Sequence, residues 1–189
     1  NNFVGGVYMA LMDPYGLELF PVELWGVVLG VTSTGFIIGG MLVAKFGLGR
    51  NPIRTMLLFV IVMGLLGAFF TIRDWWWLYA GGIWLYMMLV PAIEASEQTV
   101  IQKVVPFRTQ GRVFGFAQAF EASAAPITAF LIAPIAQFAV IPFMESQDGQ
   151  DAFGWLLGDG AARGIALIFL VAGLIMVVVA ILAFLTRSY

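Results

Sequence analysis

Two glutamates lie deep inside apolar stretches of this chain, at positions related by a simple spacing. Glu94 stands nine residues before Lys103, and Glu121 stands nine residues after Arg112. At a rise of about 1.5 Å per helical residue, both carboxyl groups are expected about 13 Å from the same surface of an apolar layer. An ionised carboxylate at such depth is costly, so it is expected to face a water-filled path or the interior of a helix bundle. We therefore predict that Glu94 and Glu121 belong to a proton- or cation-coupling site.

Polar neighbours extend this candidate site along two helical faces. Glu94 and Gln98 are four residues apart, so they share one face of a helix. Gln118 and Glu121 are three residues apart and share a face on the following apolar segment. Glu97 is a third acid inside the apolar layer. These residues are predicted to line a cavity or to couple transport to protons.

A structural role is the alternative for each of the three acids. A carboxyl group in a membrane helix can hydrogen-bond across a helix interface without taking part in transport. Glu97 can also extend its side chain toward Lys103 or Arg112 near the surface of the apolar layer. The sequence leaves both interpretations open.

The composition indicates a membrane protein and argues against most enzyme chemistry. Hydrophobic residues make up 61% of the 189 residues and charged residues only 11%, with a mean hydropathy of +0.97. Soluble domains carry about a quarter charged residues. The chain has no cysteine and no histidine, which removes disulfides, the usual zinc ligands and the commonest general base. We therefore expect no enzyme activity, no cofactor and no metal, and the chain has no nucleic-acid-binding signature.

Glycine, proline and charged residues divide the chain into predicted membrane spans. The first apolar run, 3–12, is about half of the length that a span of roughly 20 residues needs. It is expected to be the end of a helix that begins earlier, in a longer protein, and 13–16 is predicted to form a turn. Pro106 and Gly111 are predicted to separate the fourth and fifth spans. The sequence thus predicts an all-α membrane bundle of six spans, the first incomplete: 1–12 (partial), 24–44, 53–72, 75–102, 113–144 and 164–185.

The basic residues predict an orientation in the membrane. By the positive-inside rule, the loops 45–54 and 103–112 and the C-terminus are expected in the cytoplasm, with the loop 145–162 outside. Only Arg73 and Arg163 fall on the outer side. We therefore expect a multi-pass protein of the cell (inner or plasma) membrane. The basic residues of the two predicted cytoplasmic loops are Lys45, Arg50, Arg54, Lys103, Arg108 and Arg112.

Two stretches carry a resemblance to a known transporter family. The first reads QTVIQKVVP at 98–106 and QGRVF at 110–114. It resembles the connection between helices ten and eleven of the major facilitator superfamily, in the branch related to macrolide-efflux permeases. The second, GGMLVAKFG at 39–47, resembles the basic loop between helices eight and nine. It departs from the superfamily signature because Ala44 stands where an aspartate is usual, so the charge relay of that aspartate is not carried over.

The resemblance implies that the six spans are helices seven to twelve, the C-terminal half of a twelve-helix major facilitator fold. The missing N-terminal half is then the expected partner, in the same polypeptide. Glu94 and Glu121 would lie on cavity-facing helices, and the basic loops would help to close the cytoplasmic side. The implied function is secondary active transport, in which a small amphipathic drug or natural product is exported across the lipid membrane in exchange for protons that enter. Two other classes remain open: an accessory or scaffold subunit of a larger membrane complex, and a lipid-handling permease.

Overall fold

The computed structural model describes residues 2–158, 160 and 162–186, and these residues form helices and short connections without any strand. The long helices are α1 (Asn2–Leu19), α2 (Val22–Phe46), α3 (Pro52–Phe69), α4 (Trp76–Val104), α5 (Phe107–Ile135) and α9 (Ala162–Leu185). Between α5 and α9 the chain passes through the π-helix η1 (Ala136–Val140), α6 (Ile141–Glu145), α7 (Gln147–Gly149), the π-helix η2 (Gln150–Gly154) and α8 (Trp155–Leu157).

Five helical stretches among the described residues are long and apolar enough to cross a membrane. They are α2, α3, α4, the continuous stretch Phe107–Glu145 and α9. The chain is therefore an all-α, multi-pass membrane protein. The first helix, α1, is not among the five, and it carries Asp13 and Glu18.

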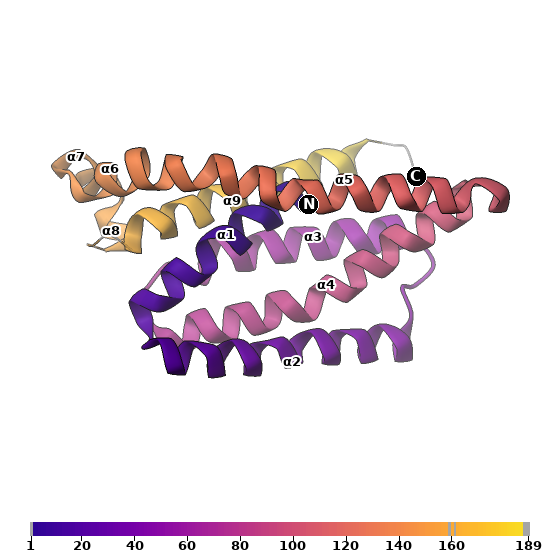
Figure 1. Ribbon diagram of the computed structural model, residues 1–189, viewed down its shortest axis with the longest axis horizontal. Coiled ribbons are helices and arrows are strands. Elements are labelled where there is room, and N and C mark those ends of the chain that lie inside the picture. Colours follow the sequence, from indigo (N-terminus) through magenta and orange to yellow (C-terminus); the bar gives the residue numbers. More distant parts are fainter. Residues whose placement is uncertain (1, 159, 161, 187–189) are drawn as a thin grey trace.

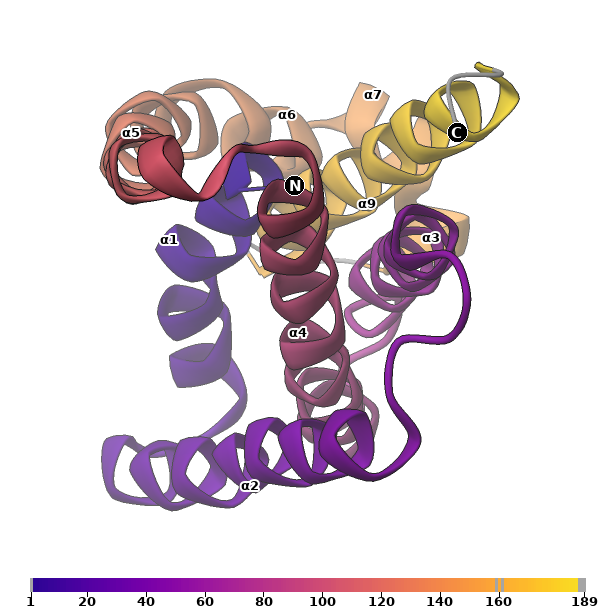
Figure 2. The same cartoon turned by 90° about the vertical axis from the view of Figure 1, so that its right-hand side faces the viewer.

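The helix α4 has neighbours on several sides. It packs against α2 and α3, while α3 also packs against α9, and α1 packs against α5. The long helices run roughly along the length of the molecule (Figure 1). Turned by 90°, the molecule shows α4 between α1 and α3, with α2 across the bottom of the view (Figure 2). Residues of α4 line both the space that it shares with α1, α2 and α5 and the surface beside α3.

Two glycines allow α2 to lie close to α4. A β-carbon added at Gly35 would overlap the carbonyl oxygen of Trp84, and one added at Gly39 would overlap the carbonyl oxygen of Met88. Small residues at such positions let membrane helices approach backbone to backbone. Gly30, on the same helix, has open space where its β-carbon would be, so it takes no part in this contact.

We expect Gly39→Val to lower the thermal midpoint of unfolding of the detergent-purified protein, because the new side chain forces α2 away from α4. Overpacking of this kind typically costs about 1–3 kcal/mol. Gly30→Val is the matched control, since it makes the same change on the same helix in open space. Similar midpoints for the two variants would show that the close α2–α4 contact does not stabilise the fold.

The predicted turn at 13–16 is wrong, because α1 continues through it as a helix. A proline inside a helix leaves a backbone carbonyl without its usual partner, and membrane helices tolerate this where neighbours supply other contacts. Pro14 removes the donor for the carbonyl oxygen four residues earlier, and other contacts hold the segment in place. The hydroxyl of Tyr79 donates to the carbonyl oxygen of Met12 at 2.7 Å. The indole N–H of Trp25 donates to the carboxylate of Asp13 at 2.9 Å. Contacts from α2 and α4 thus hold a segment whose local sequence favours a turn.

The basic segment 103–112 is mostly helical, contrary to the prediction of a loop. Lys103 lies in the last turn of α4, and α5 already begins at Phe107. Gly111 does not break the helix, because glycine in a helix interior costs only about 1 kcal/mol relative to alanine. The other basic residues of this segment lie on α5, and they are Arg108 and Arg112.

The α4–α5 connection consists of only two residues, Val105 and Pro106. Gln110, in the first turns of α5, donates its side-chain amide to the carbonyl oxygens of Gln102 and Val105, both at 3.1 Å. The carbonyl groups in the last turn of a helix have no partner within the helix. Gln110 therefore caps the end of α4 and ties the two helices together at their junction.

The other predicted loops are shorter than the sequence suggested. In 45–54, α2 extends to Phe46 and ends at Gly47, whose φ of +69° favours glycine. The side chain of Asn51 accepts a hydrogen bond from the backbone N–H of Arg54 at 3.2 Å and caps α3. The predicted loop 145–162 contains α7, η2 and α8, and Asp159 lies outside the described residues.

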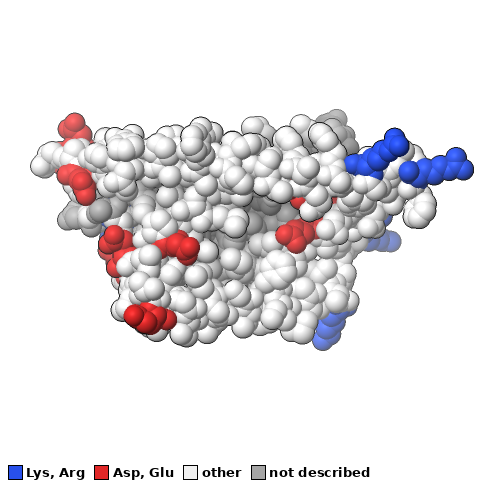
Figure 3. Space-filling model, viewed as in Figure 1, with Lys and Arg blue, Asp and Glu red and all other residues white. Residues whose placement is uncertain are grey.

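The basic residues gather at one end of the bundle, and many of the acidic residues gather at the other end (Figure 3). The basic end comprises the α2–α3 and α4–α5 junctions, and the acidic end comprises the α1–α2, α3–α4 and α6–α9 junctions. Arg187, predicted on the basic side, lies outside the described residues. The described basic-end residues are Lys45, Arg50, Arg54, Lys103, Arg108 and Arg112, and the acids at the other end include Glu18, Glu23, Asp74, Glu145 and Asp148.

Candidate functional site

A cavity of about 550 Å³ is lined by residues of α1, α2, α3, α4 and α5. A smaller cavity of about 210 Å³ lies between α4 and α5, closer to the basic end. Both cavities share the same four polar lining residues, which are Glu94, Glu97, Gln118 and Glu121. The structure thus brings together at one place four of the five residues predicted as a coupling or cavity-lining site.

The two helices contribute the acids in a defined arrangement. Glu94 and Glu97 come from α4, and Glu121 comes from α5. The side-chain amide of Gln118 donates to a carboxylate oxygen of Glu121 at 3.3 Å. Glu121 and Glu97 line the same two cavities.

The fifth predicted residue, Gln98, lines only the smaller cavity. It lies on the basic-end side of the acids, beside Ile101 and Phe114. Glu94 and Gln98, which were predicted to share one face of a helix, therefore both border the space between α4 and α5. Carboxyl groups face both cavities, and the amide of Gln98 faces the smaller one alone.

No described lysine or arginine lines either cavity. The six predicted gating residues lie at helix ends and junctions of the basic end, away from the acids. Glu97 forms no ion pair with Lys103 or Arg112, since Arg163–Asp74 is the one ion pair found among the described residues. The negative charge of the three acids is therefore not balanced by a neighbouring cationic side chain. A proton or a cationic ligand would supply that balance.

The acids do not form a recognisable metal site. Among the described residues, no group of three or more Asp and Glu side chains is placed so that it could hold a metal ion. The site therefore offers separate carboxyl groups around an open space.

The rest of the larger cavity has a soft, apolar wall. Methionine side chains can adjust to ligands of different shape because they are unbranched and polarisable. The hydroxyl of Tyr86, which also lines this cavity, is buried and has no hydrogen-bond partner among the described residues. No sequence pattern marks this position, because Tyr86 lies in an otherwise apolar stretch. The apolar wall includes Met9, Met12, Phe36, Met63, Phe70 and Met87.

Packed aromatic rings separate the larger cavity from the acidic end. Tyr8 lines the cavity and stacks on Phe169, with ring centroids 4.9 Å apart. Phe169 packs against Phe70 at 5.6 Å, and Tyr15 packs against Tyr79 at 4.8 Å. All five side chains are buried. This aromatic cluster closes the cavity on the side that faces α9 and the acidic end.

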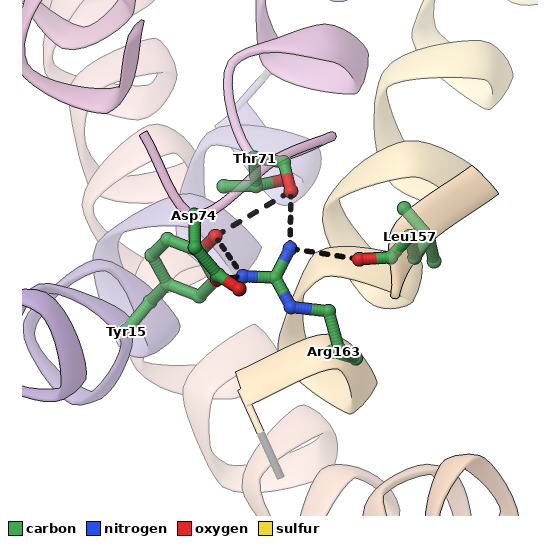
Figure 4. Close-up of polar contacts among 5 residues, drawn as sticks. All are labelled: Tyr15, Thr71, Asp74, Leu157 and Arg163. Carbon is green, nitrogen blue, oxygen red and sulfur yellow. Dashed lines mark hydrogen bonds and ion pairs between the residues drawn. The ribbon is translucent and has the colours of Figure 1, made fainter. Parts of the chain in front are cut away.

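A buried arginine holds the acidic end together (Figure 4). Arg163, at the start of α9, is fully buried. Its guanidinium group donates to the carbonyl oxygens of Leu157 at 3.1 Å and Thr71 at 3.2 Å, and to the hydroxyl of Tyr15 at 3.0 Å. It also forms an ion pair with Asp74, whose side chain remains 59% exposed. Arg163 thus joins α1, the α3–α4 connection, α8 and α9, and its role is structural.

Sequence reasoning placed Arg163 on the outer side of the membrane and assigned it no function. Its partners are Tyr15, Thr71, Asp74 and Leu157, and most of them are distant along the chain. No local pattern marks a residue of this kind, because its burial depends on how four separate elements meet.

No protein-family model, no curated protein and no solved structure matches this chain. The assignment of a function therefore depends on the cavity itself and on the resemblance carried by 39–47 and 98–114.

Proposed function

We propose that this chain is part of a secondary active transporter that exports amphipathic cations in exchange for protons. The observation that carries the proposal is the larger cavity, in which Glu94, Glu97 and Glu121 meet an apolar wall and no described lysine or arginine compensates their charge. The apolar wall would bind the hydrophobic body of a substrate. The acids would bind its positive charge.

Protons and substrate would compete for the same carboxyl groups. Deprotonated acids attract a cation strongly in a site of low dielectric constant. Protonation removes the negative charge, so the cation leaves, and loss of the proton restores the site. The Gln118 amide, which donates to Glu121, would keep that side chain oriented toward the cavity in both states. If the two events occur on opposite sides of the membrane, each proton that enters drives substrate out.

Alternating access would come from rocking of this helical half against a second half, around a site near the middle of the membrane. The resemblance of 39–47 and 98–114 to major facilitator transporters supports this arrangement, with the second half as an N-terminal six-helix unit of the same polypeptide. The distribution of Lys and Arg supports a cytoplasmic basic end in the plasma membrane. The basic residues at the α2–α3 and α4–α5 junctions would then help to close the cytoplasmic side.

The experiment uses two ions of nearly equal size and shape but opposite charge, tetraphenylphosphonium and tetraphenylborate. The protein, purified at its native length, is reconstituted into liposomes with an imposed pH gradient. We expect the gradient to drive transport of the phosphonium cation, with saturation, and an ionophore that collapses the gradient to abolish it. In detergent, we expect saturable binding of the cation and no binding of the anion at the same concentration.

Two results would contradict the proposal. Equal binding of both ions would show that the acids do not select charge. Movement of neither ion under the gradient, together with gradient-driven movement of a fluorescent phospholipid, would favour the lipid-handling permease. An accessory or scaffold subunit would transport none of these compounds.

A further inference from the structure

The smaller cavity differs from the larger one in the character of its lining. Most of its lining residues carry a polar side chain, whereas most residues around the larger cavity are apolar. Water fills a cavity that is polar and has enough room. The volume of about 210 Å³ leaves room for several water molecules, each of which occupies about 30 Å³ in the liquid. The polar lining residues are Glu94, Glu97, Gln98, Gln118 and Glu121.

The smaller cavity extends from the acids toward the basic end. The helices α4 and α5 diverge from their short junction (Figure 1), and residues of these two helices line the cavity. On α4 the lining runs from Glu94 to Ile101, which corresponds to about 10 Å along the helix axis. Ile101 lies in the last turns of α4, and Phe114 faces the cavity from the first turns of α5. The cavity therefore leads from the depth of the acids to the α4–α5 junction.

The two cavities suit occupants of different size. Sites for drug-sized ligands have volumes of about 300–1,000 Å³. The larger cavity, at about 550 Å³, falls within this range, and the smaller one, at about 210 Å³, falls below it. Gln98 lines only the smaller cavity, and its amide group can both donate and accept hydrogen bonds. It therefore offers water a polar partner between the acids and the basic end.

The ionisable groups around the smaller cavity are the three acids. Glu94 and Glu97 face it from α4, and Glu121 faces it from α5. The basic residues of the α4–α5 junction line neither cavity, and the larger cavity adds only the hydroxyls of Tyr8 and Tyr86 among the described ionisable side chains. A proton that arrives through the smaller cavity thus meets the same carboxyl groups that face the larger one.

We propose that the smaller cavity is a water-filled path for protons between the acids and the basic end, separate from the route of the substrate. A protonated acid gives its proton to a water molecule and becomes a carboxylate, and the proton leaves along the water as hydronium. The apolar body of the substrate stays in the larger cavity. This inference rests on the proposed function, in which the basic end faces the cytoplasm and protons are released there.

Cysteine labelling tests the path, because residues 1–189 contain no cysteine. Any cysteine outside this range in the native-length protein is first replaced by serine. Ala117 lines only the smaller cavity, whereas Ala119 is exposed on the same helix and lines neither cavity. The thiolate is the reactive form of cysteine, and it forms in water but not among lipid chains. The probe is the water-soluble, membrane-impermeant methanethiosulfonate ethyltrimethylammonium.

We expect Ala117→Cys to react at least tenfold faster than Ala119→Cys when the probe is added on the basic side of membrane vesicles. Equal rates for the two variants would overturn the path. Reaction of Ala117→Cys from the acidic side alone would also overturn it. Labelling does not require transport, so it tests the water path even if wild type exports no tetraphenylphosphonium, a result that would contradict the proposed function.

Filling the smaller cavity separates proton release from substrate binding. We expect Ala117→Leu to bind tetraphenylphosphonium in detergent within twofold of the wild-type affinity, and to export it under a pH gradient at least fivefold more slowly. Ala119→Leu, the matched control, is expected to behave as wild type in both measurements. Export by Ala117→Leu at the wild-type rate would overturn the path, and so would loss of binding, because the substrate would then occupy the smaller cavity. Thermal midpoints show whether both variants are folded.

Discussion

Replacing Glu94 by Gln is expected to lower pH-gradient-driven export of tetraphenylphosphonium at least tenfold, with normal insertion of the protein into the membrane. Glutamine keeps the size and hydrogen-bonding capacity of the side chain but cannot carry negative charge or release a proton. A unit charge 4 Å from a cation contributes about 4 kcal/mol at an effective dielectric constant near 20. Loss of even a third of this attraction corresponds to a tenfold change in affinity. Initial transport rates in proteoliposomes measure the effect.

The position of Glu121 leads us to expect an effect at least as large in Glu121→Gln, because this residue lines the same two cavities and accepts a hydrogen bond from Gln118. Glu145→Gln is the matched control, since it makes the same chemical change at an exposed acid on the acidic end, outside both cavities. Unchanged gradient-driven transport in Glu94→Gln would exclude a proton-carrying role for that residue. A loss of transport in Glu145→Gln as large as in Glu94→Gln would mean that transport depends on the overall negative charge of the protein and not on the acids of the cavity.

The second large effect is expected from Arg163→Met, which we expect to destabilise the fold by about 3 kcal/mol or more, because the variant loses three buried hydrogen bonds from a charged donor, each worth about 1.5–3 kcal/mol. Methionine fills much of the same space but removes the guanidinium donor from the hydroxyl of Tyr15 and from the carbonyl oxygen of Leu157. The carbonyl oxygen of Thr71 keeps only the long hydrogen bond from the hydroxyl of Tyr15, at 3.4 Å. The thermal midpoint of unfolding in detergent, followed by circular dichroism, measures the change.

Two companion variants separate the contributions in this cluster. Asp74→Asn is expected to cost less than about 1 kcal/mol, because a pair with one exposed partner is screened by water, and the Asp74 side chain is 59% exposed. Arg108→Met makes the arginine change at an exposed position of the basic end and is expected to leave the midpoint unchanged. A midpoint for Arg163→Met equal to that of Arg108→Met would show that the buried arginine does not brace the acidic end.

The sequence was most informative where the physical cost was highest. An acid in an apolar layer is expensive, so the matched depth of Glu94 and Glu121 predicted a shared site before any contact was known. The structure places both at the same cavities. The separation of basic and acidic junctions followed in the same way from charge alone. The membrane character could also be predicted, because the length and apolar composition of a membrane helix are visible in its own sequence.

Other features depended on contacts between distant parts of the chain. The segment 13–16 has the composition of a turn, but Trp25 and Tyr79 hold it as a helix. Glycine often ends a helix, but Gly111 lies inside α5. The capping contacts of Gln110 favour a start of α5 before this glycine. Such contacts follow from the packed fold, and neither leaves a periodic pattern in the sequence.

The two-residue connection between α4 and α5 has a consequence for biosynthesis. Three carboxyl groups lie on these two helices, and translocon-based scales assign about 2.5–3.5 kcal/mol to an aspartate at the centre of a single inserted helix. Because only Val105 and Pro106 join them, α4 and α5 stay close together in the bilayer, and we expect them to insert as one hairpin. In that hairpin the amide of Gln118 already donates to Glu121, and Glu97 lines the same small space between the two helices. The short α4–α5 connection thus allows the acids to face the partner helix during insertion, before the remaining helices assemble around them.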